Sequence, residues 1–175
     1  MNTYYLEVSQ LREYCNKFNC GDKIYLTGTV YTARDAAHKR IKQLLDNDEK
    51  LPFELKDCAI YYAGPTPTPE KLSIGSCGPT TSSRMDNFAP MLYDLGMVAS
   101  IGKGQRNGQV INAIIRNDAV YLCAIGGAGA LASKCIDSCE VIAFDDLGCE
   151  SVKQLHFNDF PLFVAIDSKG NTLFK

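Results

Sequence analysis

Ile24-Tyr25-Leu26-Thr27-Gly28-Thr29-Val30-Tyr31 runs directly into Thr32-Ala33-Arg34-Asp35 in this chain. The first segment is apolar and rich in aromatic and β-branched residues, which is typical of a strand. The second places a hydroxyl three residues before a carboxylate, which is the signature of a helix start. The helix that follows has an apolar stripe at helical spacing, made of Ala37, Ile41, Leu44 and Leu45. The stretch therefore predicts a strand that ends where a helix begins, with Arg34 in the first helical turn.

A second junction of the same kind occurs at Gly78-Pro79-Thr80-Thr81-Ser82-Ser83-Arg84-Met85-Asp86. A short strand is predicted before it at 72–75. Ser83 and Asp86 have the spacing of a capping pair, so Arg84 is also predicted in a first helical turn. The expected helix ends at Gly96, and its apolar stripe would be Met85, Phe88, Ala89, Leu92 and Leu95.

A cation in a first helical turn is unfavourably placed, because the backbone dipoles already give that end about half a positive charge. A single arginine of this kind would be interpreted as a solvated surface charge. Two of them, Arg34 and Arg84, each beside hydroxyls after a predicted strand, favour a site that binds an anion.

The rest of the chain continues the alternation of strands and helices. A short lead-in with a brief helix is expected over 1–20. Further strands are predicted at 58–62, 97–101, 119–125, 141–144 and 162–166, a helix at 109–115, and a hairpin-like turn at 167–171. The pattern predicts one three-layer α/β domain, in which ligands gather beyond the carboxyl ends of the strands.

Three cations fall beyond predicted strand ends: Arg34, Arg84 and Lys103, the last in a Gly-Lys-Gly turn. Together with nearby hydroxyls they would bind both ends of a small dicarboxylate through charge-assisted hydrogen bonds of about 1.5–3 kcal/mol each. His38 lies one turn beyond Arg34, where it would either reach the same ligand or orient the arginine.

Composition and charge argue against several classes of function. The net charge of −2 gives no electrostatic reason to expect a nucleic-acid or membrane partner. No signal peptide is predicted at the start, and the apolar stretch 119–132 is interrupted by glycines, so a cytoplasmic location is expected. The eight cysteines include no Cys-x-x-Cys pair and the chain has two histidines, so we expect free thiols and no metal held by this chain.

Two alternatives compete with a dicarboxylate enzyme. Gly127-Ala128-Gly129-Ala130-Leu131-Ala132 follows an apolar run and fits a dinucleotide fingerprint, but Asp137 comes too soon after it for a crossover helix. The second alternative is a binding module that senses a metabolite anion without turning it over.

Several longer segments resemble the β region of class I, iron–sulfur fumarate hydratases. The resemblance extends from about Gly21 to the end of the chain. It rests on Thr27–Arg40, Tyr62–Pro67, Gly75–Asp86, Ile101–Gly104 and Gly126–Leu131. The β subunit of tartrate dehydratase is similar in the arginine, threonine and lysine motifs, whereas the Gly-Gly-Ala-Gly-Ala segment is more like the fumarase version.

The resemblance implies a swivelling β/β/α domain over 21–175 and the reversible hydration of fumarate to (S)-malate. In that family an α subunit holds a four-iron cluster, so this chain would be active only in αβ pairs and would ligate no metal itself. Tartrate dehydratase or a related hydroxy-diacid dehydratase remains the alternative enzyme.

The resemblance also assigns roles to individual residues. Arg34, Arg84 and Lys103 correspond to the carboxylate-binding cations, with help from Thr81 and Ser82. Thr80 matches the catalytic base proposed for the family. A threonine hydroxyl is a weak base unless nearby charges stabilise its alkoxide, so Asp35 or a carboxylate of the partner remains an alternative.

Overall fold

The structure is a computed structural model that describes residues 1–70, 72–125 and 129–174. The strands are β1 (Thr3–Glu7), β2 (Lys23–Thr32), β3 (Ala59–Tyr61), β4 (Ala99–Gly102), β5 (Val120–Cys123), β6 (Ile136–Ala143) and β7 (Val152–Ile166). The α-helices are α1 (Leu11–Tyr14), α2 (Asp35–Asp46), α3 (Ala89–Asp94), α4 (Gly108–Arg116) and α5 (Gly129–Ala132). The 3-10 helices are η1 (Val8–Gln10), η2 (Cys15–Lys17), η3 (Ser82–Met85), η4 (Ser133–Cys135) and η5 (Asp145–Glu150).

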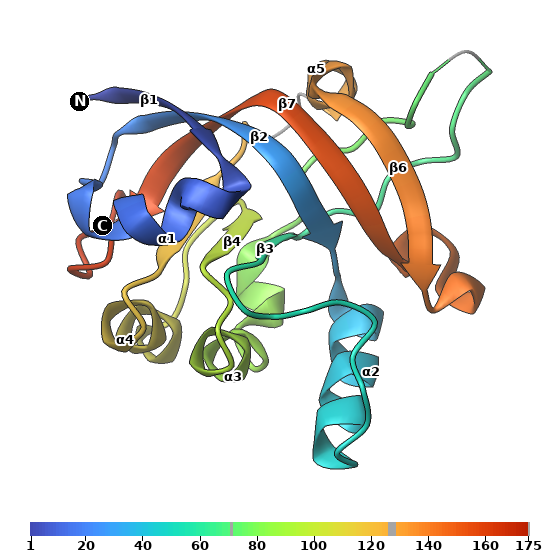
Figure 1. Cartoon of the computed structure of the whole chain (residues 1–175), viewed down its shortest axis with the longest axis horizontal. Helices are drawn as coiled ribbons and strands as arrows, with labels where there is room; N and C mark the ends of the chain where they lie inside the picture. The colour runs from blue at the N-terminus through green and yellow to red at the C-terminus, as the bar shows by residue number, and fades with distance from the viewer. Residues whose placement is uncertain (71, 126–128, 175) are drawn as a thin grey trace.

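The strands form one mixed sheet in the order β1-β2-β3-β4-β5-β7-β6 (Figure 1). Strands β1 to β5 are parallel to one another, whereas β7 is antiparallel to both β5 and β6. The long strand β7 also pairs with β2, so β2, β3, β4, β5 and β7 close into a ring. The prediction of an α/β domain is confirmed, with a sheet that is mixed.

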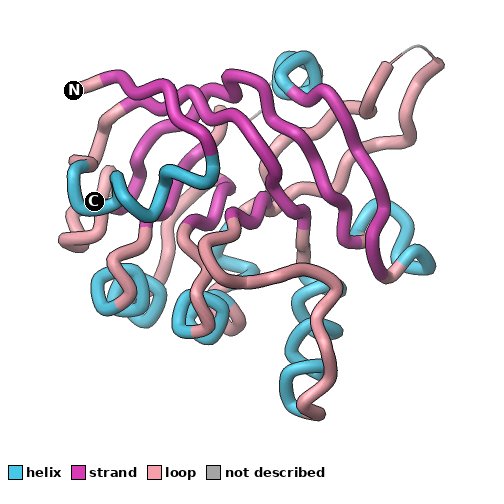
Figure 2. Tube along the Cα trace, viewed as in Figure 1, coloured by secondary structure: helices cyan, strands magenta, loops and turns pink. Residues whose placement is uncertain are grey.

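Two hydrophobic cores lie on the two faces of strands β3 to β5. Tyr61 points into the ring, where its ring centroid lies 5.7 Å from that of Phe157 and 5.6 Å from that of Phe160. Its neighbours Ile60 and Tyr62 belong to the other core, under the helices. Helices α2, α3 and α4 lie together on that side of the sheet (Figures 1 and 2). Alternate residues of each strand therefore fill different cores.

The first twenty residues, expected as a lead-in, contribute a strand to the sheet. Strand β1 pairs in parallel with β2 from Thr3 opposite Lys23 to Glu7 opposite Thr27. After it, Leu11, Cys15 and Phe18 are fully buried. The N-terminal segment is therefore part of both the sheet and the core.

The strands predicted at 58–62, 97–101 and 119–125 and the helix predicted at 109–115 are confirmed with small shifts, as β3, β4, β5 and α4. The strands predicted at 141–144 and 162–166 are only parts of the longer β6 and β7, and two further features are wrong. Residues 72–75 form no strand. Leu95 is 48% exposed and does not belong to the apolar stripe of α3. Gly96 does end this helix region, with a φ of +112° that favours glycine.

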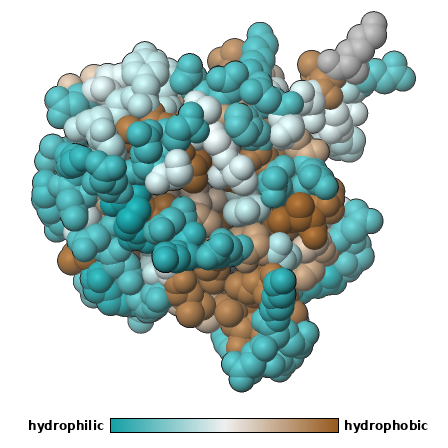
Figure 3. Space-filling view, viewed as in Figure 1, coloured by the Kyte–Doolittle hydropathy of each residue, from teal (hydrophilic) through white to brown (hydrophobic). Residues whose placement is uncertain are grey.

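The surface is mostly hydrophilic on the face shown in Figure 3, with apolar side chains gathered over the region of α2 and α3. Partly buried side chains such as Leu51 and Met91 pack there against the helix-side core. Among the described residues, no helix has both the length and the apolar character needed to cross a membrane.

Candidate active site

The first predicted site residues lie where β2 leads into α2. Arg34 is the N-cap residue of α2, in an extended conformation, and Asp35 is its first helical residue. The predicted capping by Thr32 is wrong, because its hydroxyl donates to Ser151 O at 3.4 Å and accepts from Lys153 N at 3.0 Å. The Thr32 side chain therefore does not cap α2 but links the end of β2 to the start of β7.

The second junction also differs from the prediction. Arg84 lies in the four-residue 3-10 helix η3, and α3 begins only at Ala89. The predicted pair of Ser83 and Asp86 is not a capping box, because the Asp86 carboxylate accepts from Arg106 Nε at 2.6 Å and from Asn107 N at 2.8 Å. Arg84 is therefore held at the end of a short turn rather than in the first turn of a longer helix.

The segment before η3 is held across the carboxyl ends of β3 and β4. Thr80 N donates to Tyr62 O at 2.7 Å, just beyond β3. Ser82 N donates to Lys103 O at 2.9 Å, just beyond β4, and Lys103 N donates to Ser82 Oγ at 3.0 Å. Ser82 is fully buried, so its polar groups hold Lys103 in place. Thr81, beside it, is exposed.

The structure brings the two arginines to one place. Arg84 Nε donates to Asp35 Oδ1 at 3.0 Å, and Asp35 is the residue after Arg34. Lys103 is joined to the same loop through Ser82, two residues before Arg84. Because β2, β3 and β4 are neighbours and parallel, Arg34 after β2 and Lys103 after β4 lie at one edge of the sheet. The loop that leads to Arg84 is bound across the same edge. The cations gather where the sequence predicted a ligand.

Three buried side-chain atoms in the described residues have no hydrogen-bond partner: Arg34 Nε, Asp35 Oδ2 and His38 Nε2. All three belong to the start of α2. Arg34 Nε lies 3.2 Å from Glu150 Oε1, an ion-pair distance without hydrogen-bond alignment. A buried polar atom left unpaired costs about 1–3 kcal/mol, so such atoms are rare in folded proteins and concentrate at functional sites. Their concentration here makes the start of α2 the candidate binding site.

The His38 side chain binds the backbone of this turn. Its Nδ1 lies 2.8 Å from Arg34 O, an acceptor, so the proton of the neutral ring is on Nδ1. Burial lowers the pKa of His38 to about 4, and the ring is therefore neutral at pH 7. Its side chain packs against Tyr62 and Phe88. His38 thus fixes the backbone of Arg34.

We expect the stability of the protein to fall as the pH is lowered from 6.5 to 4. The folded pKa of His38 is about 4 and its ordinary value is 6.5, so in this range the unfolded chain binds more protons. The loss reaches about 3 kcal/mol at pH 4, and the contribution is constant above pH 6.5. Urea unfolding at several pH values measures it. His38→Gln should flatten the profile, whereas His156→Gln, at an exposed ring on β7, should not.

A buried polar network beneath the loop was not predicted from the sequence. Arg106 pairs with Asp86, and its Nη1 donates to Ser100 Oγ at 2.9 Å. Its guanidinium also lies over the Tyr121 ring, 4.9 Å from the centroid. The Asp86 carboxylate further accepts from the amide of Asn107, which caps α4. The network joins η3, β4 and α4, and so fixes the loops that carry Arg84 and Lys103.

Gly102→Ala is expected to destabilise the fold by about 1–3 kcal/mol, because the new methyl group overpacks the loop. A Cβ at Gly102 would lie 2.0 Å from Ser82 Oγ and 3.1 Å from the Tyr62 ring. Ser82 cannot turn away without losing its bond to Lys103. The measurement is the free energy of unfolding in urea. Gly108→Ala is the control, because a Cβ there meets nothing within 4 Å. Equal stability of both variants would contradict the expected overpacking.

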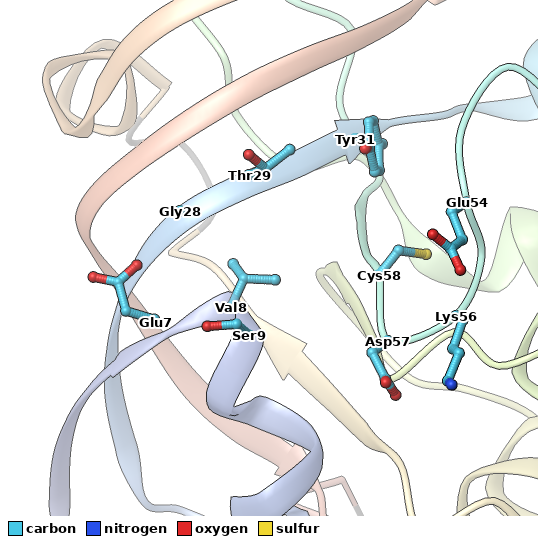
Figure 4. Close-up of a pocket in the computed structure, with 10 residues that line it drawn as sticks. All are labelled: Glu7, Val8, Ser9, Gly28, Thr29, Tyr31, Glu54, Lys56, Asp57 and Cys58. Atoms are coloured by element: carbon cyan, nitrogen blue, oxygen red, sulfur yellow. The ribbon is translucent and has the colours of Figure 1, made fainter.

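A pocket of about 480 Å³ lies away from these residues, between β2, the start of η1 and residues 54–58 (Figure 4). It contains none of the predicted site residues. Its charged lining consists of Glu7, Glu54, Asp57 and Lys56. An excess of carboxylates repels a dianion, so the electrostatics favour the start of α2 over this pocket.

The cysteines show no metal-ligating arrangement. No group of three or more His, Cys, Asp or Glu side chains suited to a metal occurs within residues 1–70, 72–125 and 129–174. All eight cysteines are free thiols. Burial raises the pKa of Cys15, Cys58 and Cys77 to about 12, which disfavours the thiolate form that binds metals. The described side chains do not fit an iron–sulfur cluster.

The dinucleotide fingerprint lies partly outside the described residues, which omit 126–128. In the described part, α5 has only four residues. The next strand, β6, pairs antiparallel with β7. This arrangement is not the crossover to a parallel strand that a dinucleotide fold uses.

The fold is an α/β domain, and its candidate site gathers three cations at one edge of the sheet. A family model described as the fumarase C-terminus matches residues 2–175, and the chain belongs to this family. It is 40% identical over 162 residues to the aerobic class I fumarate hydratase of Escherichia coli strain K12, covering 91% of this chain and 30% of that protein. Fumarate hydratase 2 of Leishmania major is 38% identical over 169 residues, which cover 95% of this chain and 30% of that protein.

Another relative is of similar size to this chain. The putative L(+)-tartrate dehydratase subunit beta of Methanocaldococcus jannaschii is 39% identical over 165 residues, covering 91% of this chain and 85% of that protein. The family predicted from the sequence is thus confirmed. The chain spans less than a third of the fumarate hydratases it matches and most of the tartrate dehydratase subunit.

Proposed function

We propose that this chain is the β subunit of a class I fumarate hydratase, which hydrates fumarate reversibly to (S)-malate together with an α subunit. The observation that carries the proposal is that Arg84 pairs with Asp35, the residue next to Arg34, at the start of α2, where three buried polar atoms are unpaired. A site with two guanidinium groups and a nearby lysine is chemically suited to a small molecule with two carboxylates.

In this proposal Arg34, Arg84 and Lys103 hold the two carboxylates of the substrate. Removing a proton from the carbon beside a carboxylate places additional negative charge on that carboxylate. Fixed cations stabilise this charge as it develops, and they need no reorganisation at that moment. Thr81 is exposed at the site edge and contributes a hydroxyl, whereas Ser82 contributes through its hold on Lys103.

The proton itself would be taken by Thr80 or Asp35. Thr80 is held by its amide to Tyr62 O, and no hydrogen bond joins its hydroxyl to another described residue. Asp35 has one oxygen bound by Arg84, which weakens it as a base, and one buried oxygen that is unpaired. Burial lowers the pKa of His38 to about 4, which makes its ring a weak base, so we assign His38 to orienting Arg34 through the bond from Nδ1 to Arg34 O.

The four-iron cluster of the proposed enzyme would be held by the α subunit, because the described residues of this chain do not fit one. The two-core architecture would act as a swivelling β/β/α domain that closes over the site of that subunit. The site agrees with such closure, because Thr81 is exposed and the Arg84 side chain is 50% exposed. Closure would exclude water and bring the cations to the substrate.

The test is anaerobic co-expression with the candidate α subunit, followed by purification and assay. We expect a complex that hydrates fumarate, and no turnover by either chain alone. Turnover by this chain alone, or a complex inactive on fumarate, would contradict the proposal. Tartrate and mesaconate belong in the same assay.

A second candidate is the β subunit of L(+)-tartrate dehydratase. The specific observation is that the similar Methanocaldococcus jannaschii protein carries that name, with the subunit designation, and is covered over 85% of its length. Dehydration of tartrate in preference to malate would favour this function.

A further inference from the structure

We propose that Glu150 is a positioning residue that decides which edge of the Arg34 guanidinium meets the substrate carboxylate. The inference rests on the proposed function, since it concerns how Arg34 binds a dicarboxylate. Glu150 ends η5, a segment far from Arg34 in sequence, and η5 lies against the start of α2.

The contact between the two side chains is close and shielded. Arg34 Nε lies 3.2 Å from Glu150 Oε1, and the side chains are only 22% and 23% exposed. A partly buried ion pair restricts the rotation of a guanidinium more than a solvated surface pair does. Glu150 thus occupies the Nε edge of Arg34.

Backbone also lies close to Arg34, at Gly64. A Cβ at Gly64 would lie 3.1 Å from both Arg34 Cδ and Nη1, and 3.0 Å from Cys149 O. Gly64 is therefore needed for the chain to pass this closely over the arginine. Between Gly64 and Glu150, the guanidinium has little freedom to turn.

This restriction leaves the two terminal nitrogens of Arg34, Nη1 and Nη2, for a ligand. No hydrogen bond joins its Nη1 or Nη2 to another described residue, so the terminal pair of nitrogens remains available. A carboxylate binds such a pair through two parallel N–H···O bonds. With Glu150 on the Nε edge, the substrate carboxylate meets Arg34 end-on, through the two Nη groups.

Glu150 is itself held in place by Lys153. Lys153 Nζ donates to Gly148 O at 3.1 Å, to Cys149 O at 3.2 Å and to Ser151 Oγ at 2.7 Å. Only 8% of Lys153 is exposed. The three acceptors surround Glu150 in sequence, so one buried ammonium group fixes the backbone from which Glu150 extends. The contact with Arg34 is therefore built on a rigid support.

The same segment offers a matched control. Asp146 also lies on η5 and also pairs with an arginine of α2, with Arg40 Nη1 at 2.7 Å from its Oδ1. This pair is at the surface, and the Asp146 side chain is 65% exposed. Asp146→Asn therefore removes a similar charge from the same segment without touching Arg34.

The experiment compares steady-state kinetics of the assembled enzyme carrying Glu150→Ala, Glu150→Gln or Asp146→Asn. We expect Glu150→Ala to raise KM for the dicarboxylate at least tenfold, because Arg34 loses its orientation. Glu150→Gln should stay within about threefold of wild type, since its amide keeps an oxygen of the same size and position beside Nε. Asp146→Asn should match wild type. An unchanged KM for Glu150→Ala overturns the inference, and a lowered KM would identify Glu150 as a competitor of the substrate.

A second measurement separates this inference from the proposed function. In the nitrogen-15-labelled chain, the Arg34 Nε–H signal is assigned by its loss in Arg34→Lys. We expect Glu150→Ala to shift and broaden this signal, and Asp146→Asn to leave it unchanged. An unaffected signal in Glu150→Ala overturns the inference whatever the enzyme does. A shifted signal in a protein whose assembled form turns over no dicarboxylate would instead contradict the proposed function.

Discussion

Replacing Arg84 by alanine is expected to lower kcat/KM for the dicarboxylate at least a hundredfold in the assembled enzyme. A hundredfold loss corresponds to about 2.7 kcal/mol, the size of one or two charge-assisted hydrogen bonds. The side chain is half-exposed and, among the residues that the structure describes, it pairs with Asp35 through Nε, so its other donors are available to a ligand. Its removal should change the free energy of unfolding by no more than about 1 kcal/mol.

Two further variants make this test specific. Arg84→Lys keeps the charge but loses the two-pronged geometry, so we expect an intermediate loss. Arg116→Ala is the control, because Arg116 is similarly exposed and similarly paired with a carboxylate, Asp94, on α3. Near-normal kcat/KM in Arg84→Ala would remove Arg84 from the site. A loss equal to that of Arg116→Ala would show that surface charge alone accounts for the effect.

Asp86→Ala is expected to destabilise the protein by about 3–5 kcal/mol, the largest effect on stability that we predict. The pair of Arg106 and Asp86 is buried, with side chains 0% and 7% exposed, and the distance from Nε to Oδ1 is 2.6 Å. Removing the carboxylate leaves the guanidinium charge in the core without its counter-ion. The amide of Asn107 would lose its acceptor as well.

Urea unfolding measures this loss, with the slope m expected to stay unchanged. For a chain of this size, the same change lowers Tm by about 2–4 °C per kcal/mol. Asp94→Ala is the matched control: it also removes an aspartate from an arginine, but at the surface, where such pairs contribute about 0–1 kcal/mol. A cost for Asp86→Ala no larger than that of Asp94→Ala would contradict the structural role of the network.

Much of the fold could be predicted because strand and helix patterns are local properties of the sequence. The strand ending before Arg34 and the helix after it appear nearly as expected, as β2 and α2. The gathering of Arg34 and Lys103 also followed from a general property of parallel sheets, that ligand sites form at their carboxyl edge. Arg84 reaches the same edge on a loop, because the strand expected at 72–75 does not form.

The wrong predictions at the two helix starts have a common physical cause. Side chains with the sequence spacing of helix caps form hydrogen bonds with residues that are distant in sequence. Thr32 and Asp86 both have the spacing of helix caps, yet their oxygens bind Ser151 and Arg106. Strand β1 escaped prediction because only Leu6 of its residues is buried, so no clear alternation of polar and apolar residues marks it. The burial of Arg106 could not be predicted, because nothing in the sequence around a single arginine indicates that its side chain is buried.

The pairing of β7 with both β2 and β5 limits how the cations can adapt to a ligand. Arg34 follows β2 and Lys103 follows β4, two members of the same closed ring. Neither strand can slide without breaking ladders on both sides, so the spacing between these cations is set by the hydrogen-bond registers. The distance between the backbone positions of these two cations is therefore fixed by the fold. We expect the domain to discriminate diacids by the length of the carbon chain between the two acid groups, because it cannot stretch to meet a longer one.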